Sequence, residues 1–145
     1  MSREVEYICS LPQLQELTDF WIKQLHLEAW DIRVMFGDKD DLRDDEGGIA
    51  DGVAMHLYSV EKAVIKVLTQ ESHREDVEEK DWPFKQDMEV TLVHELLHLV
   101  WEPFRPKAEG SAEYLMWHTQ LDRTAKLLVE LKRCGGELGQ LNSDS

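Results

Sequence analysis

The stretch TLVHELLHLVWEP, residues 91–103, constrains the fold of this chain more than any other feature. Its apolar residues predict a buried helix over residues 87–101, which a following proline ends. His94, Glu95 and His98 stand in the middle of that helix. Burying two imidazoles and a carboxylate is costly unless these groups are paired or bind an ion. Two interpretations stay open: core histidines that hydrogen bonds satisfy beside an exposed glutamate, and a bound ion, which we favour.

The spacing of these three residues matches the HExxH arrangement of catalytic zinc sites. Residues four apart lie on one face of an α-helix, so His94 and His98 can converge on a single ion. Glu95 points about 100° away, where it can reach a water molecule on the metal without binding the metal itself. The pattern predicts that the two histidines hold zinc and that Glu95 acts as general base.

A catalytic zinc ion usually has a third protein ligand, and three downstream residues are candidates. His118 is favoured, because the last predicted helix presents a stripe at spacings of three and four that turns it toward the core. The stripe consists of Tyr114, His118, Leu121, Ala125 and Leu128. Glu113 and Glu109 remain open as alternatives, since zinc peptidases often use a glutamate from a later helix.

The rest of the chain predicts an α+β domain. An amphipathic helix is expected over residues 11–27, and strands over residues 30–36, 49–60 and 62–69. The second and third strands are close enough in sequence to form a hairpin. A last helix is expected over residues 111–134, where two glycines follow. We expect a small sheet of three or slightly more strands, antiparallel or mixed. Along the chain, its strands follow an N-terminal helix and precede two C-terminal helices.

Length and charge restrict the class of protein further. The 145 residues suit a single domain spanning residues 1–145, with an ordered core over about residues 8–135. The formal net charge of −14 argues against nucleic acid and anionic membranes as partners. No apolar run is long enough to span a membrane, and no secretory signal is apparent, so we expect a cytoplasmic protein. Cys9 and Cys134 are expected to be reduced thiols.

With HELLH at residues 94–98, preceding strands and a later helix that carries a candidate ligand, the chain resembles the zincin metallopeptidases. It is most similar to small stand-alone forms: minimal gluzincin-like and SprT-like domains, and the short metallopeptidases of phage and mobile genomes. The resemblance extends in element order over about residues 11–134, and only the HExxH motif is specific. Gluzincins use a glutamate where His118 is favoured here, which leaves the subfamily open.

The resemblance implies a zincin-like fold and zinc-dependent hydrolysis of a peptide or protein substrate. His94 and His98 would bind Zn²⁺, Glu95 would be general base and acid, and the peptide would lie antiparallel to an edge strand. Residues 49–60 are the expected edge strand. Two alternatives stay open: a non-catalytic domain that zinc stabilises and whose acidic surface binds a partner protein, and a structural protein without a metal.

Overall fold

The computed structural model describes residues 8–43, 49–72 and 87–143. In chain order its elements are α1 (Leu11–Gln24), β1 (Asp31–Gly37), β2 (Gly52–Leu57), the 3-10 helix η1 (Tyr58–Val60), β3 (Lys62–Leu68), α3 (Met88–Trp101), the 3-10 helix η2 (Glu102–Phe104) and α4 (Ala112–Ser143). The predicted α+β class is confirmed, with a three-stranded sheet that follows the N-terminal helix and precedes α3 and α4.

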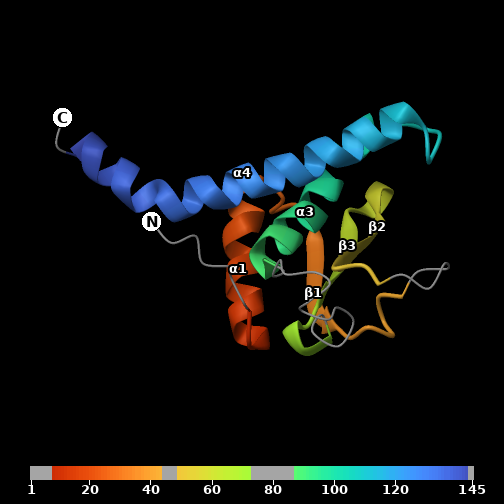
Figure 1. The fold of residues 1–145 in the computed structure, drawn as a ribbon, viewed down its shortest axis with the longest axis horizontal. Coiled ribbons are helices and arrows are strands. Elements are labelled where there is room, and N and C mark those ends of the chain that lie inside the picture. The colour runs from red at the N-terminus through yellow and green to blue at the C-terminus, as the bar shows by residue number, and fades with distance from the viewer. Residues whose placement is uncertain (1–7, 44–48, 73–86, 144–145) are drawn as a thin grey trace, which may run out of the picture.

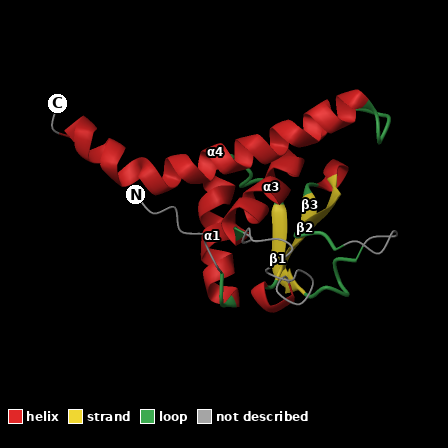
Figure 2. Cartoon of the chain, viewed as in Figure 1, coloured by secondary structure: helices red, strands yellow, loops and turns green. Residues whose placement is uncertain are grey.

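The sheet is mixed and has the strand order β1-β3-β2. The central strand β3 pairs parallel to β1 and antiparallel to β2, so β1 and β2 are the edge strands. The predicted hairpin between β2 and β3 is confirmed, because η1 and the left-handed backbone of Glu61 reverse the chain. The strand predicted over residues 49–60 was too long at both ends, since Ile49 makes only an isolated bridge with Arg43. In Figure 2, α1 and α3 lie on one side of the three strands, and α4 runs across the top of the view.

The helix α1 begins where its sequence predicts. The Ser10 side chain accepts a hydrogen bond from the backbone N–H of Gln13, and Pro12 occupies the first turn. Its apolar face buries Leu14 and Trp21 against the other elements. In β1 every second residue faces the core, as the alternating sequence predicts.

The helix α3 lies at the centre of the molecule, where it contacts α1, α4, β2 and β3. Asp87 caps its first turn by accepting a hydrogen bond from the backbone N–H of Val90. Most of its residues are buried, which agrees with the apolar sequence around the HELLH motif. The largest apolar side chains of the core come from α1, β3, α3 and α4: Leu14, Ile65, Leu68, Met88, Leu92, Leu96, Leu99 and Leu121.

The helix α4 crosses above α1 and α3 in Figure 1 and extends past α1 toward the C-terminus. Ser111 caps it by accepting a hydrogen bond from the backbone N–H of Tyr114. The prediction that this helix ends by Cys134 was wrong, because α4 continues to Ser143. Glycine costs about 1 kcal/mol relative to alanine in a helix, yet it leaves the backbone hydrogen bonds intact. Only a proline would block them, and none follows residue 106 in the sequence.

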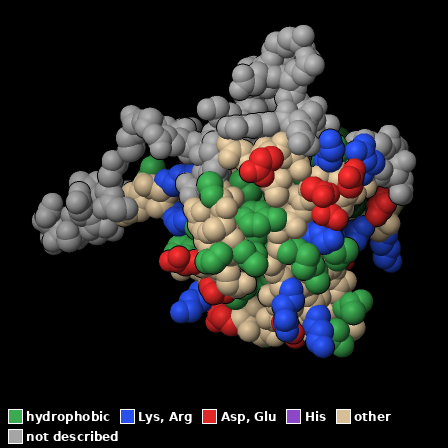
Figure 3. All heavy atoms as spheres, turned by 90° about the horizontal axis from the view of Figure 1, so that it is seen from below, with side chains coloured by type: hydrophobic (Ala, Val, Ile, Leu, Met, Phe, Trp, Pro, Cys, Tyr) green, Lys and Arg blue, Asp and Glu red, His purple; other side chains and the backbone are tan. Residues whose placement is uncertain are grey.

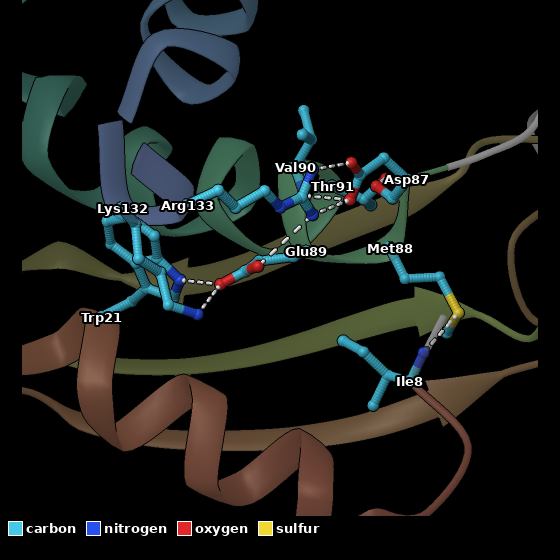
Figure 4. A network of polar contacts seen from close by, with 9 residues as sticks. All are labelled: Ile8, Trp21, Asp87, Met88, Glu89, Val90, Thr91, Lys132 and Arg133. Atoms are coloured by element: carbon cyan, nitrogen blue, oxygen red, sulfur yellow. Dashed lines mark hydrogen bonds and ion pairs between the residues drawn. The ribbon is translucent and has the colours of Figure 1, made fainter. Parts of the chain in front are cut away.

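A buried carboxylate, Glu89, ties the three helices together. Its side chain is 2% exposed and accepts hydrogen bonds from Trp21 Nε1 of α1 at 2.8 Å and from Lys132 Nζ of α4 at 2.6 Å. Arg133 donates to both oxygens of Asp87, at 2.7 and 3.1 Å (Figure 4). These contacts fix α4 against the N-terminal end of α3, and they set the position of the residues that α4 carries one to four turns earlier.

The surface opposite α4 carries both apolar and charged side chains. On the face turned away from α4, hydrophobic side chains gather near the middle with charged side chains around them, and no described histidine is visible (Figure 3). Among the helices in the described part of the chain, none combines the length and the apolar character that a membrane crossing needs.

Candidate metal centre

Three histidines from two helices converge at the contact between α3 and α4. His94 and His98 lie one turn apart on α3, and His118 comes from α4. One ring nitrogen of each lies within 4.8 Å of a nitrogen of the other two. The ring centroids are 5.0 Å apart for His94 and His98, 4.9 Å for His94 and His118, and 5.7 Å for His98 and His118.

The spacing of the α3 nitrogens fits one shared ion. His94 Nε2 and His98 Nε2 are 3.2 Å apart. Two imidazole nitrogens bound about 2.0–2.1 Å from a tetrahedral ion lie about 3.3 Å from each other. The three residues therefore lie close enough to bind a metal ion, and a set of imidazole nitrogens suits a first-row transition metal.

Burial keeps the two α3 histidines in the neutral form that binds metals. Burial, with the neighbouring His118 as a second cause, lowers the pKa of His94 to about 4. Burial followed by the nearby His94 and His118 lowers the pKa of His98 to about 3. Both rings thus keep a free nitrogen lone pair throughout the neutral pH range.

Asp122 lies beside the first of these histidines. Its Oδ1 atom is 3.8 Å from His94 Nδ1, a distance of electrostatic contact rather than of a hydrogen bond, and Lys126 pairs with its other oxygen at 2.9 Å. A carboxylate on this side favours the tautomer with hydrogen on Nδ1, which directs the lone pair of Nε2 toward His98. Asp122 stands one helical turn after His118, so one face of α4 supplies both residues.

Glu95 is buried beside His98. It is 6% exposed, and its Oε1 atom is 3.8 Å from His98 Nε2. Burial raises the pKa of this carboxyl to about 8, and the charge of Asp51 adds to the increase. In the absence of a cation, this residue is therefore mostly protonated at neutral pH.

Gly52, the first residue of β2, makes room for Glu95. A Cβ atom at this position would lie 2.7 Å from Thr91 Cγ2 and 3.1 Å from Glu95 Cγ. A glycine in a strand often marks the close approach of another group, and here that group is the face of α3 that carries the motif. Glycine thus allows β2 to pack directly against the candidate general base.

The two alternative ligands lie outside this cluster. Among the described residues, the potential metal ligands that come together in a group of three or more are His94, His98 and His118, without Glu113 or Glu109. Glu109 pairs with Arg105 at 2.6 Å. The arrangement agrees with the choice of His118, whose role as a metal ligand stays a prediction.

Aromatic residues of α4 surround the histidines. Tyr114 stacks on His118 with ring centroids 6.4 Å apart and planes 11° apart. Trp117 meets His98 edge-on at 5.5 Å, and its buried Nε1 atom has no hydrogen-bond partner within the described residues. The indole thus lies against one side of His98.

His56 is a neighbour that the sequence did not single out. It lies on β2, its Nε2 atom is 3.3 Å from Glu102 Oε2, and its charge contributes to the low pKa of His98. The sequence spacing between His56 and the HELLH motif does not indicate that the two are close in space. His56 reaches the end of α3 because β2 pairs with β3. His73 lies outside the described residues.

Comparison of the chain with protein-family models, with curated proteins and with solved structures finds no match. Any function therefore has to be argued from the site itself.

Proposed function

We propose that this protein is a zinc-dependent metallopeptidase with a zincin-like fold. His94, His98 and His118 would hold Zn²⁺, and Glu95 would act as general base. The observation that carries the proposal is the convergence of the three histidines, with the Glu95 carboxyl 3.8 Å from one of them. Three protein ligands leave one coordination position for water or substrate, as catalytic zinc sites require.

A bound zinc ion would supply Lewis-acid polarisation of the scissile carbonyl and would lower the pKa of a coordinated water molecule. The protein's own contribution begins with Glu95. A cation beside this buried carboxyl favours its ionised form, which can accept a proton from the attacking water and pass it to the leaving amine. Asp122 would orient the ring of His94, and Trp117 would exclude water from the side of His98.

The decisive experiment compares the wild type with Glu95→Gln. Glutamine keeps the size of the side chain but cannot accept a proton, so the variant should bind one equivalent of zinc and cleave nothing. Elemental analysis measures the metal, and a broad peptide library analysed by mass spectrometry measures cleavage. The proposal fails if purified protein neither contains nor takes up a stoichiometric transition metal, or if the wild type cleaves no peptide that Glu95→Gln spares.

The second candidate is a non-catalytic domain that zinc stabilises and that binds a partner protein. The observation in its favour is that the three histidines come from two helices, so an ion would hold α3 and α4 together. Zinc content cannot distinguish the two functions, but dependence of cleavage on Glu95 does. A protein that unfolds on chelation and shows no cleavage that depends on Glu95 would belong to this class.

A further inference from the structure

The three histidines of the candidate metal centre are held in the molecule to different degrees. His94 and His98 belong to α3, the central helix, and their side chains are 14% and 18% exposed. His118 is exposed, and its ring contacts within the described residues are with these two histidines and with Tyr114. The position of His118 therefore depends on how α4 lies against the rest of the molecule.

Within the described residues, α4 packs chiefly against α3. The middle of the contact is apolar, with Leu121, Ala125 and Val129 of α4 buried. Beyond it, Lys132 reaches the N-terminal end of α3, where its Nζ atom contacts Glu89. Lys132 comes 14 positions after His118, which is about four turns and about 21 Å along an α-helix. Both residues therefore lie on nearly the same face of α4, one at each end of its contact with α3.

The contact at the far end has the chemistry of a fixed anchor. The buried Glu89 accepts hydrogen bonds through Oε2 from Lys132 Nζ at 2.6 Å and from Trp21 Nε1 at 2.8 Å (Figure 4). Hydrogen bonds that join two charged groups are stronger than neutral ones, and a buried charge that loses its partner is strongly unfavourable. A rotation of α4 about its axis, or a shift along it, would break this contact.

We propose that Glu89 is a positioning residue of the metal centre, and that it acts through Lys132 by holding α4 in the rotation and register that bring His118 to the other two histidines. The metal ion and the contact of Glu89 with Lys132 favour the same placement of α4, so each strengthens the other. Neither Glu89 nor Lys132 belongs to the histidine cluster. The inference rests on the proposed function only for the metal, because positioning requires no hydrolysis.

The test measures the Kd of the full-length protein for Ni²⁺ by isothermal titration calorimetry, since imidazole ligands suit this ion. Lys132→Met keeps most of the side chain and removes the charge, so it should raise the Kd about tenfold. Lys132→Arg restores a cation and should recover most of the affinity. Arg123→Met is the matched control, because Arg123 is exposed on the same helix and the substitution removes the same charge. It should leave the Kd unchanged.

A double-mutant cycle separates positioning from a general loss of stability. In the His118→Ala background, Ni²⁺ can bind only His94 and His98, which share one helix, so the placement of α4 no longer matters. Lys132→Met should leave the weaker Kd of that background unchanged. A substitution that merely unfolded part of the protein would raise the Kd in both backgrounds.

Glu89→Gln tests the same contact from α3. It removes the charge without changing the size of the side chain, and it should also raise the Kd only when His118 is present. Because Glu89 is 2% exposed, this variant can fail to fold. Lys132 is 31% exposed, so Lys132→Met still decides the matter in that case.

An increase in Kd that requires His118 supports the inference. An equal Kd in the wild type and Lys132→Met overturns it, as does an equal increase in the His118→Ala background or in Arg123→Met. A wild type that binds no metal overturns both this inference and the proposed function. Metal binding that depends on Lys132, without cleavage that depends on Glu95, supports the positioning role and refutes the peptidase. Cleavage that depends on Glu95, with a Kd that Lys132→Met does not change, does the reverse.

Discussion

Replacement of Glu95 by glutamine should stabilise the metal-free protein, and the gain should grow with pH. The carboxyl is 6% exposed, and burial raises its pKa in the folded state to about 8 from an ordinary value of 4.5. A raised folded pKa means that the group's contribution to stability is complete below pH 4.5 and is lost as the pH rises toward 8. Glutamine does not titrate, so the variant escapes this loss.

The magnitude follows from the two pKa values. By linkage, the ionisable carboxyl of Glu95 lowers the free energy of unfolding by about 1 kcal/mol at pH 5.5 and by about 4 kcal/mol at pH 8. The advantage of Glu95→Gln over the wild type should therefore increase by about 3 kcal/mol between these pH values. His94 and His98 are present in both proteins, so their titration largely cancels in the comparison.

Urea denaturation of chelator-treated protein measures this difference, with the fluorescence of the 5 tryptophans reporting unfolding. Stoichiometric zinc provides the internal control. A cation beside Glu95 stabilises the ionised carboxyl, so the increase with pH should largely disappear when zinc is added. A difference between the two proteins that stays constant from pH 5.5 to 8 would refute the reasoning, because Glu95 would then not be a desolvated carboxyl.

The remaining predictions concern the ligands and their supports. His118→Ala should abolish stoichiometric zinc binding while Glu113→Gln retains it, as measured by equilibrium dialysis and elemental analysis; the opposite result would assign the third ligand to Glu113. Asp122→Asn should raise the Kd for zinc about 10- to 100-fold in a competition titration with a chromophoric chelator, and an unchanged Kd would show that the carboxylate does not orient His94. Gly52→Ala should lower the free energy of unfolding by about 1–3 kcal/mol, because the new Cβ atom lies 2.7 Å from Thr91 Cγ2. Thr91→Ser removes that methyl group and should recover part of the loss in urea denaturation, whereas no recovery would mean that the clash is elsewhere.

The sequence predicts the elements that depend on local pattern. The period of apolar residues and the caps at Ser10 and Asp87 give the starts of α1 and α3 correctly, and alternation gives β1. The end of α4 was predicted wrongly, because glycine only weakens a helix, and the other residues of the helix can offset that cost. Local pattern also cannot show that β3 lies between β1 and β2, since strand order depends on packing across the whole domain.

The candidate site also has some features that the sequence predicts and others that it does not. The positions of His94 and His98 relative to each other follow from helix geometry alone. The stripe of α4 brings His118 close to them, although His118 is exposed and does not lie in the core as the stripe predicts. Asp122 follows from the same stripe once His118 is placed, because it stands one turn later on the helix. The approach of His56 and the fit of Gly52 against Glu95 depend on how the hairpin docks on α3, which no periodicity encodes.

Gly52 connects the chemistry of the candidate base to the packing of β2 against α3. Its lack of a side chain lets β2 lie against Thr91 and Glu95, and this close packing removes water from the carboxyl and raises its pKa. Ionising Glu95 in this environment is unfavourable unless a positive charge lies nearby, and the histidine cluster is where one would bind. A cation held by the histidines would thus lie beside the buried carboxyl and keep it ionised, which gives the buried position of Glu95 a physical reason.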